Sequence, residues 1–543
     1  MPRTKLGPTM ATLLICATAL SASGGFALLN PAHARTVTWV RAADATTVDP
    51  HASDDSVALT LNQQIYEPLV LRDAQGKTVA GLAESWSLTS DPLVWEFRLR
   101  RNVAFHDGSP FNADDVIFSI DRARGAHSDF KGLLAAIEQV SAPDSHTIRI
   151  KTRGPTPLMP ANLTHVLMMS KAWAEKNGAA QVAEPAQITR AHTFRNTNGT
   201  GAFVLVSREI GSRTVMRRNE GYWGQGQSPV EISELVYRPI PNDTERVQAL
   251  LTGEADLLQD VPVNEMPRLQ ANKALTISIG PENRSVFLGL NVGAAAPSEV
   301  GTEGRNPLAD KRVREMMSAA INRQVIQRNV LLGQAIPTGA IAPSSVNGYP
   351  RQLDRIPASD PAKLKATLTE AGWPNGFRLK LDCPREGVVR GEALCRNIAQ
   401  QLTQSGVMVQ PVVRDLGAHL EFLHRMPSET DLFLHSVNIP SFDSEQMLLD
   451  LFHSRTSSKG RGNFTRYANP VLDKLIAGLP EQTDFSARIQ AMAAAWRIAQ
   501  DETIYIPLFI PTVAYAMKAD LTVQPDIENQ PKLRFARVKS NIQ

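Results

Sequence analysis

The sequence predicts a protein of mixed α/β fold that is divided into at least two lobes. The chain has 543 residues, and a single hydrophobic core rarely grows beyond about 250 to 300 residues, so more than one core is needed. Short alternating strand patterns mix with amphipathic helix patterns along the whole chain, and no internal repeat is present. Hydrophobic residues make up 43% and charged residues 20% of the chain, which is typical of a folded globular protein.

The charge balance gives no reason to expect a nucleic acid or an anionic lipid as the main partner. Lysine and arginine number 57, aspartate and glutamate number 54, and the formal net charge is +3. A bias this small does not create a basic surface. Aromatic residues are only 6% of the chain, so a long base-stacking groove is not indicated. We therefore expect no nucleic-acid partner.

Residues 1–34 have the pattern of a secretory signal peptide. Arg3 and Lys5 precede an apolar stretch of small residues over 10–29, and the Ala-His-Ala sequence that ends at Ala34 matches a signal-peptidase site. The alternative is an uncleaved membrane anchor, because the stretch is nearly long enough to span a bilayer. We expect cleavage after Ala34 and export to the periplasm.

A half-buried strand followed by a capped helix is predicted in the first third of the chain. Residues 94–99 alternate between apolar and polar side chains. A turn follows, in which His106 and Asp107 could form an acid/base pair, although the Gly-Ser-Pro after them favours a capped turn. Asn112 then has the position of a helix N-cap, with Asp115 three residues later. The sequence thus predicts a helix that begins directly after Asn112.

Two further helices are predicted in the second half. Apolar residues recur from Val313 at the spacings i+3, i+4, i+7 and i+8, which indicates an amphipathic helix that begins near Asp310. Another helix has Pro361 at its first position and ends at Gly372. The methionines on the apolar face of the first of these helices are better suited to core packing than to a ligand surface.

The cysteines predict one disulfide. Cys16 would be removed with the signal peptide, and the apolar residues before it lack the small side chain expected next to a lipidated cysteine. Cys383 ends a predicted strand that begins at Phe377, and Cys395 lies in a predicted helix over 391–403. An even pair in an exported chain makes a disulfide plausible. Two buried free thiols are the alternative.

Catalytic signatures are missing from the sequence. No GxSxG nucleophile elbow, no phosphate-binding loop and no complete GxGxxG is present. His419 and His424 are five residues apart, and five helical steps turn the second imidazole about 140° away from the first, unlike a zinc-binding pair. We expect no enzyme activity, no metal and no cofactor. An exported chain of this kind is better suited to binding.

A series of short motifs runs in one order from about residue 49 to the end of the chain. They lie at residues 83–86, 95–103, 105–108, 113–119, 198–203, 218–223, 246–256, 310–322, 370–373, 462–470 and 506–508. In order and spacing this series resembles the extracytoplasmic solute-binding proteins of ABC importers, and within them the large peptide/nickel-type class, family 5.

The resemblance implies a bilobal periplasmic binding protein of type II, with a hinge and an extra mixed α/β domain inserted in the first lobe. The division that we expect is as follows: signal peptide 1–34, lobe I 35–80, 200–283 and 511–543, inserted domain 81–199, and lobe II 284–510.

The resemblance also implies the function. A monomeric receptor would capture a small molecule or a peptide in the cleft between its lobes, close around it, and deliver it to the membrane permease subunits of an ABC transporter with their ATPase. Two other classes stay open at this point. One is an exported hydrolase on a related scaffold, and the other is a periplasmic chaperone or sensor with the same fold.

One family motif is altered. Peptide binders of this family carry Gly-Trp-x-x-Asp in the second lobe, where the Asp pairs with the peptide's α-ammonium. Here Ser436 and Val437 replace Gly-Trp, and Pro440 replaces the Asp. Ordinary di- and tripeptides should therefore bind weakly, and we expect a less cationic ligand such as a modified peptide, an opine-like conjugate or an oligosaccharide. A metal chelate also stays open, and a shift of one residue could turn Asn438 or Asp443 inward.

The candidate ligand contacts lie at strand ends, where the sites of open α/β sheets concentrate. Each has an alternative role as a turn cap, an exposed side chain or a buried core residue. In chain order the candidates are His51, Ser53, Arg284, His435, Val437, Asn438 and Asp443.

Overall fold

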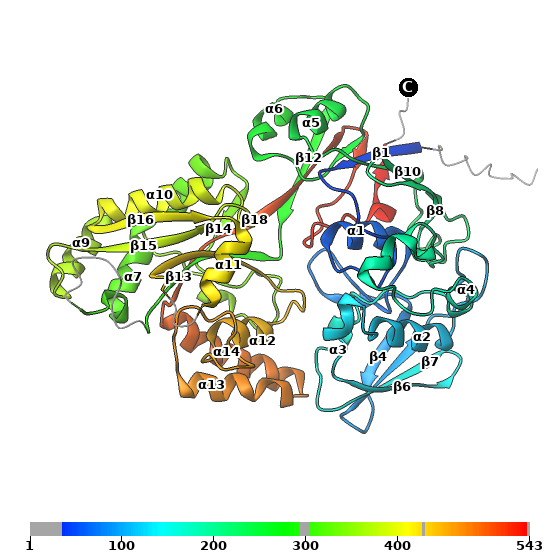
Figure 1. Ribbon diagram of the computed structural model, residues 1–543, viewed down its shortest axis with the longest axis horizontal. Coiled ribbons are helices and arrows are strands. Elements are labelled where there is room, and N and C mark those ends of the chain that lie inside the picture. Colours follow the sequence, from blue (N-terminus) through cyan, green and yellow to red (C-terminus); the bar gives the residue numbers. More distant parts are fainter. Residues whose placement is uncertain (1–34, 294–303, 426–428, 540–543) are drawn as a thin grey trace, which may run out of the picture.

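The computed structural model describes residues 35–293, 304–425 and 429–539. The expected signal peptide, with Cys16 and the cleavage site, lies outside these residues. Figure 1 shows two bodies, lobe I on the right and lobe II on the left, joined by a few strands. Over the three described ranges, no helix is both long and apolar enough to cross a membrane.

Lobe I is built on a mixed sheet in which the first strand is central. Strand β1 (Arg35–Arg41) pairs in parallel with β10 (Ile232–Pro239) and β11 (Leu257–Leu258). A hairpin of β2 (Val70–Arg72) and β3 (Thr78–Ala80) lies beside this sheet. The other elements of lobe I are β8 (Phe203–Glu209), β9 (Arg213–Arg218), β12 (Leu275–Pro281), β19 (Leu521–Thr522), β20 (Arg537–Val538), α1 (Ser56–Ile65), α5 (Asp243–Leu251) and α6 (Met266–Gln270).

The inserted domain has its own antiparallel sheet, in the order β4-β5-β7-β6. The predicted strand is confirmed as β5 (Val94–Leu99), and the predicted helix as α2 (Ala113–Ala123). Asn112 caps α2, and the Asp115 carboxylate accepts a hydrogen bond from the Asn112 backbone at 3.0 Å. The other elements are β4 (Ala83–Leu88), β6 (Ile137–Asp144), β7 (Thr147–Thr152), α3 (Met159–Asn162) and α4 (Lys171–Lys176).

Lobe II contains a second part of the large sheet, in the order β16-β15-β17-β13. The two predicted helices are confirmed as α7 (Lys311–Ala320), capped by Asp310, and α9 (Pro361–Glu370). The other elements are β13 (Arg284–Leu290), β14 (Ala335–Pro337), β15 (Phe377–Pro384), β16 (Val407–Arg414), β17 (Leu432–Asn438), α8 (Arg323–Val325), α10 (Gly391–Gln404), α11 (Leu416–His424), α12 (Ser444–Met447), α13 (Pro470–Ala477) and α14 (Phe485–Asp501).

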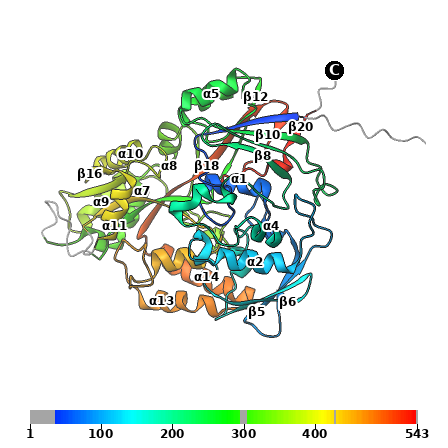
Figure 2. The ribbon, with the colours of Figure 1, turned by 45° about the vertical axis from the view of Figure 1, so that its right-hand side comes forward.

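Strand β18 (Tyr505–Lys518) belongs to both lobes. Its first half pairs with β13 and β14 in lobe II, and its second half pairs with β12 and β11 in lobe I. Figure 2 shows this long strand passing from one body to the other. The chain crosses a second time between β12 and β13, where the buried Asn283 donates from its side chain to the Ile439 carbonyl at 2.7 Å. The lobes are therefore connected at two neighbouring crossings.

Cys383 and Cys395 join β15 to α10 inside lobe II. Their sulfur atoms are 2.11 Å apart and their Cα atoms 6.4 Å apart. Both side chains are fully buried in the hydrophobic core that β13, β15 and β17 share with the helices of this lobe. The pair thus fastens the first turns of a helix to the strand on which it packs.

Candidate functional site

His51 lies in the core of lobe I and not in the cleft. Its side chain has no exposed surface, and its Nε2 donates to the Leu167 carbonyl at 2.8 Å. Its Nδ1 accepts from Arg122 at 3.1 Å, and Arg122 also forms a bidentate ion pair with Asp49. Burial, together with the Arg122 charge, lowers the pKa of His51 to about 4, so the ring is neutral. The expectation that His51 contacts the ligand is therefore corrected.

Three other candidates lie outside the cavities described below. The Ser53 hydroxyl donates to Asp55 at 2.6 Å, and Asp55 caps α1. Arg284 bonds Glu282 at 2.9 Å and stands beside Asn438 at the crossing, since β13 and β17 pair there. Asn438 itself is exposed. Contact of Ser53, Arg284 and Asn438 with the ligand stays a prediction.

His435 and Val437 are half-buried and pack against the core of lobe II. The His435 ring lies edge-on to Phe287 at 5.8 Å and to Phe464 at 5.7 Å. Burial lowers the pKa of His435 to about 4. Val437 packs against the same hydrophobic cluster. Neither residue lines the cavities described below, and contact of His435 and Val437 with the ligand stays a prediction.

Asp443 does line a cavity between the lobes, but its charge is already paired. Arg488 donates to both of its carboxylate oxygens, at 2.6 and 2.8 Å. The same carboxylate caps α12 by accepting from the Glu445 backbone at 2.9 Å, and Arg488 also bonds the Glu445 side chain at 2.6 Å. A ligand ammonium would have to compete with Arg488 to reach Asp443, and contact of Asp443 with the ligand stays a prediction.

Arg72, at the end of β2, was not found by sequence reasoning, and it lies where three cavities meet. The largest, here called the hairpin cavity, has a volume of about 490 Å³ and lies in lobe I. A second, here called the tryptophan cavity, has a volume of about 240 Å³ and is lined by both lobes. A third, of about 20 Å³, is lined by residues of lobe I and its inserted domain. Arg72 lines all three.

The Arg72 guanidinium has a positive charge but only carbonyl partners among the described residues. It donates to the carbonyls of Gly76 at 3.2 Å, Ala161 at 3.3 Å and Pro440 at 3.0 Å. Its carbon atom lies 4.2 Å from the ring centre of Phe442, and its buried Nε has no hydrogen-bond partner. Burial lowers the pKa of Arg72, and only the more distant Glu528 opposes this effect.

The other cations around the hairpin cavity are compensated. Arg534 lies 3.3 Å from the buried Glu67, which also accepts from Tyr222 at 2.8 Å and from Trp223 at 2.7 Å. Lys532 donates to Gln63 and lies 3.8 Å from Asp526. Among the described cations that line this cavity, Arg72 is thus the one without a carboxylate within ion-pair distance.

Lobe II reaches Arg72 through its loop after β17. Gly76, in the turn of the β2–β3 hairpin, has φ of +82°, and an added Cβ would lie 2.5 Å from the Phe442 ring. Pro440, two residues before Phe442 in the same loop, also accepts a hydrogen bond from His165 of lobe I at 3.3 Å. The position of the altered family motif therefore faces Arg72 and His165 directly.

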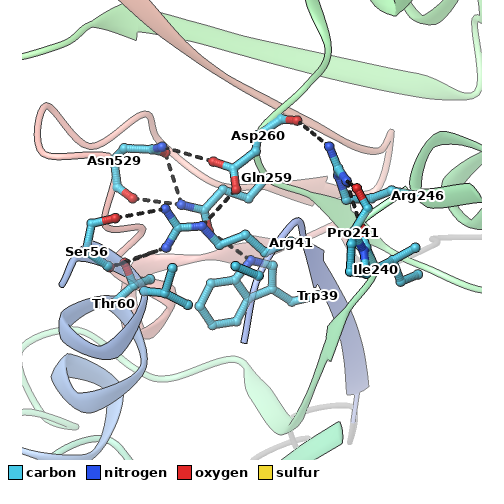
Figure 3. A network of polar contacts seen from close by, with 12 residues as sticks. Trp39, Arg41, Ser56, Thr60, Ile240, Pro241, Arg246, Gln259, Asp260 and Asn529 are labelled. Carbon is cyan, nitrogen blue, oxygen red and sulfur yellow. Dashed lines mark hydrogen bonds and ion pairs between the residues drawn. The ribbon is translucent and has the colours of Figure 1, made fainter. Parts of the chain in front are cut away.

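A network at the ends of β1 and β11 holds the C-terminal return segment in place (Figure 3). Arg41 pairs with Asp260 at 2.8 Å, and Asn529 donates to the same carboxylate at 3.1 Å. Gln259 donates to the Asn529 backbone at 2.7 Å and accepts from Trp39 at 3.1 Å. The segment fixed in this way carries Asp526, Glu528 and Lys532, whose side chains lie around the cavities at Arg72.

Comparison with known proteins identifies the class. Residues 77–459 match the family described as bacterial extracellular solute-binding proteins, family 5 Middle. The chain belongs to this family: it is a solute-binding protein of an ABC importer, a transport receptor and not an enzyme.

Its relatives resemble it over nearly the full length. The glutathione-binding protein GsiB of Escherichia coli O1:K1 / APEC is 27% identical over 520 residues, which cover 94% of this chain and 95% of that protein. HbpA2 from Haemophilus parasuis has the same fold, with a TM-score of 0.80 at 20% identity over 93% of this chain and 100% of the other. The periplasmic murein tripeptide binding protein MppA, in its unliganded open form, also has this fold, with a TM-score of 0.75. The two chains are 21% identical, and the match covers 93% of this chain and 98% of the other.

Proposed function

We propose that this receptor captures a small anionic, peptide-like solute of the glutathione type, and that Arg72 binds a carboxylate of this solute between the lobes. The observation that carries the proposal is the uncompensated charge of Arg72. A guanidinium removed from water needs a full opposite charge, and the partial charges of carbonyl oxygens replace it only in part. A ligand carboxylate would supply that charge through charge-assisted hydrogen bonds.

The lobe II side of the site agrees with this ligand class. The loop presents the Pro440 carbonyl where an acidic anchor is expected, and Asp443 is bound by Arg488. A ligand cation would therefore meet a carbonyl oxygen in place of a free carboxylate and would have to compete with Arg488 for Asp443. Glutathione has two carboxylates and one ammonium, so its net charge is negative, and the relative GsiB is named for binding it. An opine-like conjugate has the same charge pattern, whereas a neutral oligosaccharide would leave Arg72 uncompensated.

The partners and location belong to the same proposal. After removal of residues 1–34 the protein would act in the periplasm as a monomer, and its liganded form would dock on the permease subunits of an ABC transporter. The motifs quoted above and the family membership support this assignment. The alternatives of a chaperone or a sensor have no observation in their favour.

Titration calorimetry tests the proposal. Reduced glutathione and an opine should bind with micromolar affinity or better, and unmodified dipeptides should bind weakly. Arg72→Met should weaken binding roughly 10- to 150-fold, because a hydrogen-bonded charge contributes about 1.5 to 3 kcal/mol. Arg72→Lys keeps the charge and should recover part of the loss. Arg268→Met, at an exposed arginine of α6 paired with Glu265, is the matched control and should change nothing.

Two results would contradict the proposal. One is tight binding of plain dipeptides that is lost on N-acetylation, which would require an acidic anchor. The other is an Arg72→Met variant that keeps the ligand-free melting temperature and binds glutathione like the unmodified protein. Recovery of cleaved ligand after incubation would instead favour the hydrolase.

A further inference from the structure

The tryptophan cavity lies between the inserted domain and lobe II. Trp86 and Trp95, on neighbouring strands β4 and β5, line it from the inserted domain together with Leu88. Phe485 and Arg488, in the first turns of α14, line it from lobe II. Figures 1 and 2 both show the β4–β5 region and α14 on the same lower side of the molecule. The cavity is therefore closed on both sides only when the lobes are together.

The aromatic groups of this cavity are available for contact. The Trp95 indole nitrogen donates to the Thr156 carbonyl at 3.1 Å, which fixes the ring and leaves no unsatisfied donor on it. Phe485 is 70% exposed, which is unusual for a large apolar side chain directly across from two tryptophans. Exposed apolar surface beside a concave site is where ligands and partners bind.

The polar groups on the lobe II side are occupied by one another. Arg488 takes both oxygens of Asp443 and one oxygen of Glu445. Both acids are therefore already ion-paired, and a ligand cation would have to compete with Arg488 for them. Arg72, which also lines this cavity, supplies the charge that has only carbonyl partners.

From this arrangement we propose that the ligand has two parts: a carboxylate that binds Arg72, and an aromatic or alkyl group that enters the tryptophan cavity between Trp86, Trp95 and Phe485. The inference rests on the proposed function, because it uses the same Arg72 contact. It narrows the substrate class to peptide-like anions with an apolar substituent, such as thioether conjugates of glutathione. The substituent would then contact aromatic residues of both lobes and so stabilise the closed form.

The volume of the cavity fits such a group. It measures about 240 Å³, whereas a cavity of about 150 Å³ lined by apolar side chains is known to hold benzene. A benzyl or short alkyl group can therefore enter beside the bonded Arg488. Larger groups, such as a second peptide unit with several polar atoms, would leave their donors and acceptors unsatisfied there.

The test compares reduced glutathione with S-benzylglutathione by calorimetry. The benzyl conjugate should bind the unmodified protein roughly 10- to 150-fold more tightly, which is the factor that burial of a Phe-sized side chain supplies. In Phe485→Ser the ratio of the two affinities should fall to less than about fivefold. Val471→Ser is the matched control, because Val471 is a 64% exposed apolar residue in the first turn of the neighbouring α13, and it should leave the ratio unchanged.

Trp86→Leu provides a second variant and should lower the same ratio. The inference is overturned, with the proposed function intact, if both probes bind the unmodified protein equally. It is also overturned if the ratio is high but stays the same in Phe485→Ser and Trp86→Leu. If neither probe binds at millimolar concentration, the proposed function fails together with the inference.

Discussion

One cluster of buried charges in lobe I is organised around Arg122. Arg122 binds Asp49 through two hydrogen bonds and His51 through a third, although Asp49 and Arg122 are 73 residues apart in the chain. The Arg122 charge lowers the pKa of Asp49, against the effect of its burial. The same charge, added to burial, keeps His51 neutral. The contacts among Asp49, His51 and Arg122 stabilise the loop after β1. They explain the presence of these residues without a role in ligand binding.

This arrangement predicts a loss of stability in mild acid. His51 has a folded pKa of about 4 against an ordinary value of 6.5, so the unfolded chain takes up the proton first and stability falls as the pH falls below 6.5. Between pH 7 and pH 5 this one residue should cost about 2 kcal/mol. The depressed pKa of Asp49 adds a further loss only below its ordinary value of 3.8. Urea unfolding of the ligand-free protein at both pH values measures the change.

The His51→Gln variant should reduce this pH-dependent loss by about 2 kcal/mol, whatever its effect on stability at pH 7. His127→Gln, at an exposed histidine, serves as the control and should keep the full loss. An unchanged pH dependence in His51→Gln would mean that His51 has the same pKa in the folded protein as in the unfolded chain.

Among the elements, α10 is fastened to β15 by a covalent bond. Cys383 and Cys395 are 12 residues apart, and both are fully buried. We predict that the exported protein contains this disulfide. Replacing both cysteines by alanine should lower the free energy of unfolding by about 3 kcal/mol, because the unfolded chain regains the freedom of the closed loop.

Alkylation under denaturing, non-reducing conditions measures the state of this pair. Protein from an oxidising compartment should incorporate no label before reduction and two equivalents after it. Incorporation of two labels without a reductant would show that the alternative of two free thiols is right.

At the scale of the whole molecule, the connections between the lobes allow a hinge. The chain crosses between β12 and β13 and again within β18, and Asn283 at the first crossing is bonded to lobe II through Ile439 and to the return segment through Ile527. Away from the crossings, Arg72 contacts lobe II through Pro440 and Phe442. The same side chain would touch the ligand, so capture and closure would be coupled at Arg72.

We therefore expect saturating glutathione to decrease the radius of gyration in small-angle X-ray scattering and to raise the melting temperature by mass action. At a ligand concentration near the Kd of the unmodified protein, the Arg72→Met variant should show much smaller changes in both quantities. A bound ligand, verified by calorimetry, that leaves the scattering radius of the unmodified protein unchanged would rule out the hinge mechanism.

The sequence by itself determined the family, the α/β class, the capped helices α2, α7 and α9, and the strand β5. These features depend on local patterns, such as an N-cap three residues from its partner, and on motif order. The division into lobes at residues 283/284 and 510/511 stays a prediction.

The tertiary structure alone decided which side chains meet. Pro440 and Arg72 are 368 residues apart, and no periodicity or motif near either residue indicates their contact. His51 and His435 could be ligand contacts or core residues from sequence alone, because the burial of a side chain depends on elements from distant parts of the chain. The missing acidic anchor was visible in the sequence, whereas the uncompensated Arg72 became visible only once the lobes were placed together.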